Sequence, residues 1–359
     1  MITASKPFSP PVELYQNAVS QIFKNNWFTN HGPFVTELEK DLAKFFNVPY
    51  LVLVTNGTIA LQLAIKALEL KGEIITTPYS YIATTSSIVW EDCTPRFADI
   101  EPKTLNIDPL KIIDKITDKT KGILATNVYG YPCNFDEINK IAKDKKLKVI
   151  YDNAHGFSTK KNGIDIMNYG DISTISFHAT KLFHSVEGGA IACKSKDIYE
   201  KLMLLRNFGH TSPSTFGGLG INAKMNELCA AMGKTNLLFI DEILEKRKIQ
   251  WDFYNKLIQD TNIKTLNYES NKVQFNKAYF PIFLKNEEVL KKTLIHLEKR
   301  KISLRRYFYP SLNLLEYVNS FDKCIIAEDV SKRVLCLPLY HDLKTEDQIY
   351  VINTIKEIC

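Results

Sequence analysis

Short apolar runs of strand length alternate with longer amphipathic stretches over residues 50 to 193. The runs predict strands at 50–55, 74–77, 96–100, 122–129, 148–152, 172–177 and 188–193. The stretches between them have the apolar spacing of helices, at 59–68, 82–90, 109–116 and 135–145. Strands and helices that alternate in this way predict an α/β fold, with a mostly parallel sheet flanked by helices on both faces.

The pattern changes on either side of this region. Two helices are expected at 12–27 and 34–46, separated by a turn at Asn30-His-Gly-Pro33. From Asn222 to about Gln259 the spacing stays helical for some ten turns, which predicts one long helix that bridges two domains. The remainder contains a strand at 278–284 and helices at 287–301 and near the end. We therefore expect a large domain over 12–240 and a smaller α+β domain over 241–359, with residues 1–11 packing on the smaller one.

Composition adds limits to this picture. Of the 359 residues 45% are hydrophobic and 24% are charged, values typical of an ordered globular protein. The net charge of +6 comes from lysines interleaved with acids, which favours small anionic partners and argues against nucleic acid. We expect no signal peptide and no membrane span. Seven cysteines without a CxxC pair are typical of reduced thiols in a cytoplasmic protein.

Lys181 lies in the short connection between the strands predicted at 172–177 and 188–193. Burial near two strands disfavours the charged form of a lysine and suits an amine that reacts with a carbonyl. Asp152 ends another predicted strand, where a carboxylate of a parallel sheet points into the ligand crevice. Taken alone, Lys181 could be an ordinary loop lysine and Asp152 could cap the next turn.

The familiar nucleotide, metal and serine-hydrolase motifs are missing: GxGxxG, GxxxxGK[ST], HExxH and GxSxG do not occur. Instead, a strand leads into Asn56-Gly57-Thr58 and then a helix, an arrangement that offers free amides to an anion. Pyridoxal phosphate needs a lysine for its aldehyde, an acid for its ring nitrogen, and amides or hydroxyls for its phosphate. The sequence contains each of these in a plausible place.

The chain resembles the DegT/DnrJ/EryC1/StrS family of sugar aminotransferases, which are fold type I enzymes. The resemblance is carried in order by these segments: Asn30-His-Gly-Pro33, Thr55 to Thr58, Thr77-Pro78, Tyr81-Ile-Ala-Thr84, Asn106-Ile-Asp108, Asp152-Asn-Ala-His155, Ser176 to Lys181, Glu187-Gly-Gly189 and Gly220-Ile-Asn222. It implies an α/β pyridoxal-phosphate enzyme with a smaller C-terminal domain, which passes through the pyridoxamine phosphate form.

The resemblance also implies roles for single residues. Lys181 would bond to the cofactor aldehyde and then carry a proton, Asp152 would pair with the ring nitrogen, and His155 would lie near the ring hydroxyl. Other contacts to the cofactor are implied for Gly57, Thr58, Tyr81, Ser176 and Asn222. Simpler explanations remain for some of them, since Gly57-Thr58 could only start a helix and Tyr81 could be a core residue. Asn222 would reach the phosphate of a neighbouring subunit, which implies a homodimer with shared active sites.

On the substrate side, the resemblance implies transfer of the amino group of L-glutamate to a keto sugar linked to a nucleotide, for surface polysaccharide biosynthesis. The wording FHATK and EGGA around Lys181 resembles enzymes that act at C4, with dTDP-4-keto-6-deoxy-D-glucose as substrate. A C3 aminotransferase acting on a dTDP-3-keto-6-deoxyhexose is the alternative. A non-catalytic regulator that binds pyridoxal phosphate is the alternative of another class.

The basic and aromatic run at 299–310 is a candidate for the substrate rim, because arginine and tyrosine suit diphosphate oxygens. A solvated helix end followed by a loop explains it equally well. The candidate substrate residues are His184, Arg306, Tyr307 and Tyr309. His184 could equally be structural.

Overall fold

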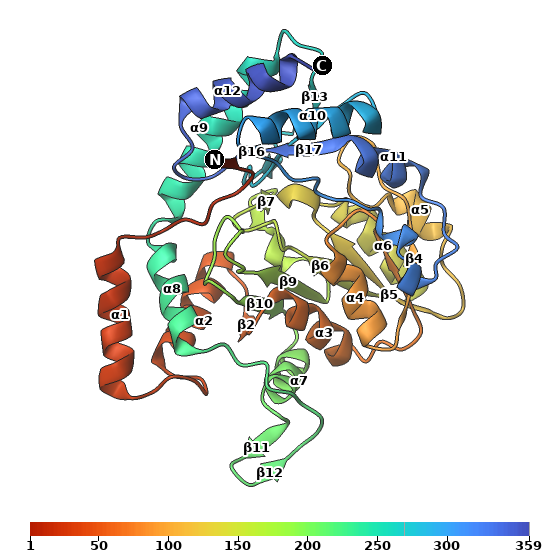
Figure 1. Ribbon diagram of the computed structural model, residues 1–359. Coiled ribbons are helices and arrows are strands. Elements are labelled where there is room, and N and C mark those ends of the chain that lie inside the picture. The colour runs from red at the N-terminus through yellow and green to blue at the C-terminus, as the bar shows by residue number, and fades with distance from the viewer. Residues whose placement is uncertain (269, 359) are drawn as a thin grey trace.

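A twisted seven-stranded sheet forms the centre of the protein (Figure 1). The computed structural model describes residues 1–268 and 270–358. In spatial order the strands are β2 (Tyr50–Val54), β10 (Gly189–Cys193), β9 (Ile172–Ser176), β6 (Lys148–Asp152), β5 (Thr120–Thr126), β3 (Glu73–Thr76) and β4 (Thr94–Phe97). Only β10 runs antiparallel to its neighbours within this sheet; β9, β6, β5, β3 and β4 pair in parallel. The predicted α/β class is confirmed.

Helices cover both faces of the sheet (Figure 1). They are α2 (Pro33–Phe46), α3 (Gly57–Ala67), α4 (Ile82–Trp90), α5 (Pro109–Ile113), α6 (Phe135–Lys145) and α7 (Lys196–Arg206). Alternate side chains of a strand point to opposite faces. In β2, Val52 and Val54 accordingly pack with α3, whereas Leu51 and Leu53 pack with α2. The two apolar cores that result fix the register of the sheet.

Smaller elements complete the chain. A three-stranded sheet is made of β13 (Lys264–Thr265), β15 (Phe280–Phe283) and β17 (Val334–Leu337), beside α10 (Glu287–Lys299), α11 (Ile325–Arg333) and α12 (Thr345–Lys356). Other short pairs join β1 (Ile2–Thr3) to β16 (Ile302–Ser303), β11 (His210–Ser212) to β12 (Thr215–Phe216), and β7 (Lys160–Lys161) to β8 (Ile164–Asp165) and β14 (Val273–Gln274). The division into domains at residue 240 stays a prediction.

The prediction of one long helix from Asn222 to Gln259 was wrong. Two helices occupy this region, α8 (Glu227–Leu237) and α9 (Ile240–Ile258), and Figure 1 shows them running from the level of the large sheet up to the smaller one. Asn226 caps the start of α8, so the residues before it are not helical. The helical conformation is interrupted between α8 and α9 at Phe239, which has φ −107° and ψ 8°. The ring of Phe239 packs on Phe8.

A side chain of helix α8 also supplies hydrogen-bond acceptors to the first turn of α2. Glu227 is buried, and its carboxylate accepts hydrogen bonds from the backbone amides of Phe34 at 2.8 Å and Val35 at 2.9 Å. These amides lie in the first turn of α2, where no intrahelical acceptor is available. The negative charge also suits the positive end of the helix. Helix α1 (Val12–Asn25) stands outside this pair, at the left of Figure 1.

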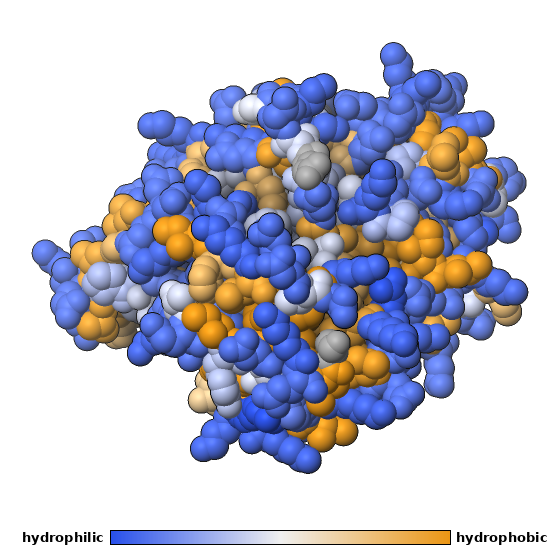
Figure 2. All heavy atoms as spheres, turned by 90° about the horizontal axis from the view of Figure 1, so that it is seen from above, coloured by the Kyte–Doolittle hydropathy of each residue, from blue (hydrophilic) through white to orange (hydrophobic). Residues whose placement is uncertain are grey.

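The surface agrees with this packing. Seen from above, polar side chains cover most of the molecule and apolar patches lie between them (Figure 2). In the part of the chain that the structure describes, six cysteines are free thiols, and the expectation for Cys359 lies outside it. Searching the same residues finds no helix that is both long and apolar enough to cross a membrane.

Candidate active site

A cavity of about 570 Å³ opens at the carboxyl ends of the parallel strands. Its walls come from the loops after β2, β3, β6 and β9, and from two segments near the smaller sheet. Ligands of open α/β sheets bind at this edge, because the loops there converge on one crevice. The cavity brings together eight of the predicted residues: Gly57, Thr58, Tyr81, Asp152, His155, Ser176, Lys181 and Tyr307.

Lys181 lies in the loop between β9 and β10, as expected. Its backbone amide donates to the carbonyl of His178 at 2.9 Å, which closes a tight turn after the strand. Burial lowers the pKa of the Lys181 amine to about 8, although the charge of Asp152 opposes this shift. A lysine with such a pKa is roughly one tenth neutral at pH 7, and only the neutral amine attacks a carbonyl.

Asp152 ends β6 and is almost fully buried. One carboxylate oxygen accepts the amide of Ala154 at 3.0 Å, and the other accepts the hydroxyl of Thr84 at 2.9 Å. Thr84 belongs to a chain of hydroxyls, since Ser80 lies 2.8 Å from Thr84 and 3.1 Å from Thr126. Burial raises the pKa of Asp152, and its hydrogen bonds and Lys181 partly offset that rise. A nearby cation would therefore be strongly favoured here.

His155 follows Asp152 and is also buried. Its ring stacks on Phe308, with centroids 5.4 Å apart, and lies edge-on to Tyr279. Burial, helped by the charge of Lys181, lowers the pKa of His155 far below its usual range. Among the residues that the structure describes, its Nδ1 has no hydrogen-bond partner. The imidazole is thus neutral, and one of its ring nitrogens is a buried polar atom without a partner in the described protein.

The wall of the cavity also contains the start of a helix, which can bind an anion. Helix α3 begins at Gly57, and Asn56 serves its first turn by accepting the Ile59 amide with its side chain at 2.9 Å and the Ala60 amide with its carbonyl at 3.1 Å. Gly57 and Thr58 line the cavity at the positive end of the helix. A Cβ at Gly57 would lie 2.7 Å from the Cβ of Ser176, so only glycine allows the two strand ends to approach this closely.

These residues fit pyridoxal phosphate. The donor set contains an amine of lowered pKa, a buried carboxylate, a neutral histidine with a free ring nitrogen, and a helix start beside the Ser176 hydroxyl. Each group matches one part of the cofactor, namely the aldehyde, the ring nitrogen, the ring hydroxyl and the phosphate. Over the described residues no cluster of histidine, cysteine and acid side chains could hold a metal ion.

Three candidate substrate residues lie outside the cavity. His184 is 4% exposed, and its Nε2 contacts the carbonyl of Phe8 at 2.8 Å. The guanidinium of Arg306 binds Glu287 and the carbonyls of Ser331 and Lys332. It also covers the ring of Tyr309, 3.4 Å from the ring centroid. Tyr309 is therefore held at the surface beside Arg306.

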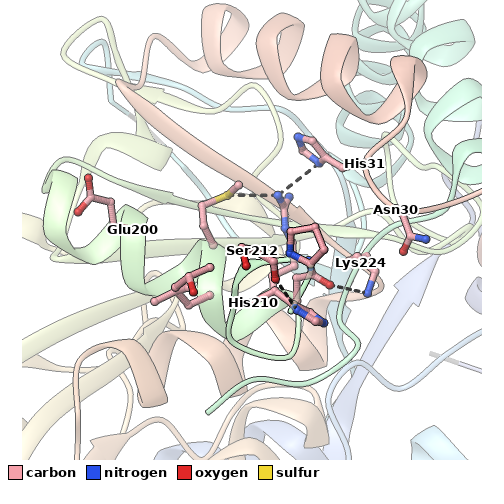
Figure 3. Close-up of a pocket in the computed structure, with 12 residues that line it drawn as sticks. Asn30, His31, Glu200, His210, Ser212 and Lys224 are labelled. Atoms are coloured by element: carbon pink, nitrogen blue, oxygen red, sulfur yellow. Dashed lines mark hydrogen bonds between the residues drawn. The ribbon is translucent and has the colours of Figure 1, made fainter. Parts of the chain in front are cut away.

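Two predicted cofactor residues have unexpected surroundings. Tyr81 caps α4 and does not lie within it; it is 59% exposed at the cavity, so its stacking on the cofactor stays a prediction. Asn222 is exposed and pairs through its backbone with Asn207. Asn207 lines a second hollow of about 910 Å³ between the loop before α2, helix α7 and the β11–β12 hairpin. Figure 3 shows His31, His210 and Lys224 around this hollow.

Several cavity residues were not singled out as candidates: Asn56, Thr84, His178, Thr180, Glu187 and Tyr279, together with Arg305 and Phe308 of the candidate run 299–310. Some had a signal, because Thr84, His178 and Glu187 fall within segments that carry the family resemblance. Arg305 precedes the candidate Arg306 directly, in an irregular segment where no periodicity shows which side chain faces inward. Tyr279 gave no signal beyond being aromatic.

Comparisons with known proteins identify the family of the chain. The model of the DegT/DnrJ/EryC1/StrS aminotransferase family matches residues 12–356. A dTDP-4-amino-4,6-dideoxy-D-glucose transaminase from Shigella dysenteriae is 40% identical, covering 99% of each chain. An Escherichia coli protein of the same name is 38% identical over 96% of this chain and 95% of its own.

A solved structure, that of DesI in the presence of its TDP-sugar product, superposes with a TM-score of 0.94 at 27% identity, over 99% of this chain and 92% of that one. The family match spans both the large sheet and the smaller one, and it includes every residue of the cavity. The chain therefore belongs to the DegT/DnrJ/EryC1/StrS aminotransferase family and is a pyridoxal-phosphate-dependent sugar aminotransferase.

Proposed function

We propose that this enzyme transfers the amino group of L-glutamate to the C4 keto group of dTDP-4-keto-6-deoxy-D-glucose. The observation that carries the proposal is the 40% identity, over 99% of both chains, to a dTDP-4-amino-4,6-dideoxy-D-glucose transaminase. The cavity supports it, because the groups that would hold pyridoxal phosphate line it together with Arg305 and Tyr307. The product would enter surface polysaccharide biosynthesis.

When bound, pyridoxal phosphate supplies an electron-accepting ring that stabilises negative charge at the substrate carbon. Asp152, fixed by Thr84 and Ala154, would keep a proton on the ring nitrogen, since its charge is otherwise costly in this buried place. His155, which stays neutral, would face the ring hydroxyl through its free Nδ1.

Lys181 would both hold the cofactor and move a proton at the substrate carbon. Its lowered pKa suits this role, because an amine near pKa 8 can accept and return a proton close to neutral pH. The amides of Gly57 and Thr58 and the hydroxyl of Ser176 would bind the phosphate. Arg305, a permanent cation in the cavity wall, would attract an anionic part of the substrate.

We also propose that the enzyme is a homodimer in which Asn222 reaches the phosphate end of the neighbouring active site. The support is its position, because Asn222 is exposed and lies beside the second hollow and outside the cavity of its own chain. Tyr81 is proposed to stack on the cofactor ring, and the chain is proposed to act in the cytoplasm.

The decisive experiment offers the enzyme and L-glutamate either dTDP-4-keto-6-deoxy-D-glucose or a dTDP-3-keto-6-deoxyhexose. NMR of the product then locates the new amine. We expect an amine at C4 from the first sugar and little turnover of the second. A 3-amino sugar as the only product would replace the C4 proposal by the C3 alternative. Glutamate that leaves the bound cofactor unchanged would support a non-catalytic regulator instead.

A further inference from the structure

Two tyrosine hydroxyls meet one backbone carbonyl below the cavity wall. Tyr79 follows β3 and Tyr129 follows β5, and both side chains are fully buried. Their hydroxyl oxygens are 2.7 Å apart. The carbonyl oxygen of Tyr307 lies within hydrogen-bond distance of both, at 3.0 Å from the Tyr79 hydroxyl. The contact joins the loops after β3 and β5 to a segment that comes about two hundred residues later in the chain.

A count of protons shows how the three oxygens share two hydrogens. Each tyrosine hydroxyl donates once, and the carbonyl of Tyr307 only accepts. Two hydrogens can occupy only two of the three contacts at one time, so one hydroxyl donates to the other, which in turn donates to the carbonyl. Either order works, so Tyr79 and Tyr129 can replace one another as the donor to Tyr307. Only the loss of both hydroxyls leaves the carbonyl without its partner.

The backbone at Tyr129 supports a specific placement of its side chain. Tyr129 has φ 55°, in the left-handed region that non-glycine residues avoid unless their surroundings enforce it. The next residue, Gly130, has φ 87°, and a Cβ there would lie 2.5 Å from both the His155 carbonyl oxygen and the Asn276 side chain. The side-chain amide of Asn276 also donates to the His155 carbonyl at 2.7 Å. This turn is thus packed against the backbone of the site.

The carbonyl that the tyrosines hold belongs to a wall of the cavity, residues 305–308. Arg305, Tyr307 and Phe308 of this wall line the cavity. The Phe308 ring lies between two others, stacked on His155 at 5.4 Å and on Tyr129 at 5.9 Å. A shift of the Tyr307 carbonyl would therefore move Phe308, which stacks on His155, and the side chains of Arg305 and Tyr307, which line the cavity.

We propose that Tyr79 and Tyr129 are positioning residues, which hold the 305–308 wall against His155 by a shared hydrogen bond to the Tyr307 carbonyl. Neither hydroxyl touches the cavity, so both act through the wall. The inference concerns the wall itself; only its substrate assay rests on the proposed function.

The test is a double-mutant cycle of Tyr79→Phe, Tyr129→Phe and the pair. Amide hydrogen exchange of the protein without substrate measures the wall directly. We expect protection of residues 303–310 to fall in the double variant and to change little in either single one. With the nucleotide sugar, KM should rise about threefold at most in the single variants and about thirtyfold in the pair, more than kcat falls.

Tyr268→Phe is the matched control. Its ring stacks on Tyr131 at 4.2 Å, and among the described residues its buried hydroxyl has no partner. Exchange that rises equally throughout the double variant, or stays unchanged at 303–310, would overturn the proposal. Because exchange needs no substrate, failure of the C4 assignment would leave this result intact.

Discussion

The hydroxyl of Thr84 donates to the carboxylate of Asp152 at 2.9 Å. Thr84 belongs to α4, so a helix beside the large sheet influences the ionisation of Asp152 in the cavity. Because this bond stabilises the ionised carboxylate, it lowers the pKa of Asp152 against the larger effect of burial. The hydroxyls of Ser80 and Thr126 extend the contact to β5.

Thr84→Val should slow the reaction roughly tenfold, which corresponds to about 1.4 kcal/mol of barrier. Without the hydroxyl the pKa of Asp152 rises, so ionisation is complete only at higher pH. The acid limb of the kcat/KM profile should therefore move to higher pH. Thr84→Ser, which keeps the donor, should retain the wild-type profile. An unshifted limb in the valine variant would show that Thr84 does not act through Asp152.

Lys181 should be the residue that borohydride links to pyridoxal phosphate, as mass spectrometry of the reduced protein can show. The yield at limiting cofactor should rise with pH up to about 8, following the lowered pKa, and then level off. An ordinary lysine would continue to gain reactivity up to about pH 10. Lys181→Ala should lose the label and at least about a thousandfold in kcat, or 4 kcal/mol. Wild-type turnover by this variant would refute the assignment.

Gly57→Ala should weaken cofactor binding about tenfold or more, because the new methyl group would meet Ser176 at 2.7 Å at the start of α3. Titration of the protein with pyridoxal phosphate, followed by absorbance, measures the change. Gly218→Ala is the control, since a Cβ at Gly218 meets nothing within 4 Å. Equal affinities in the two variants would place the phosphate elsewhere.

Arg305 and Arg306 form a natural matched pair, adjacent in sequence and opposite in placement. Arg305→Ala should raise the KM of a substrate about tenfold, as expected for a lost ion pair near 1.4 kcal/mol, with little effect on Tm. Arg306→Ala should lower Tm, because Glu287 and two carbonyls lose their donor, and should leave KM unchanged. The reverse result would support Arg306, the candidate predicted from the sequence.

Co-expression of two inactive variants can test the shared active site. Lys181→Ala and Asn222→Asp subunits, mixed at random, should recover about a quarter of wild-type activity if the dimer is two-fold symmetric and Asn222 acts across it. The mixed dimer then contains one site that has both native residues. Each variant alone must first be shown to have little activity. No recovery in the mixture would mean that Asn222 acts within its own subunit or not at all.

The sequence was most informative where chemistry follows a regular strand. Asp152, Ser176 and Gly57 each lie next to a strand end, so an alternating pattern was enough to bring them to one edge. The 305–308 wall has no such pattern, and its position is set by contacts that are distant in sequence, such as the hydrogen bond from the Cys336 amide to the Arg305 carbonyl at 2.9 Å. The prediction of one continuous helix was also wrong. At the break, Phe239 packs on Phe8, a residue that is distant in sequence.

The bond between Glu227 and the start of α2 also bears on synthesis of the chain. Residues 34 and 35 leave the ribosome long before residue 227. Their amides therefore lack this hydrogen-bond acceptor until about 190 more residues have been synthesised. Closing so long a loop costs entropy that only later contacts repay. We therefore expect nascent chains that stop before residue 227 to have a frayed α2, open to proteases at its first turn.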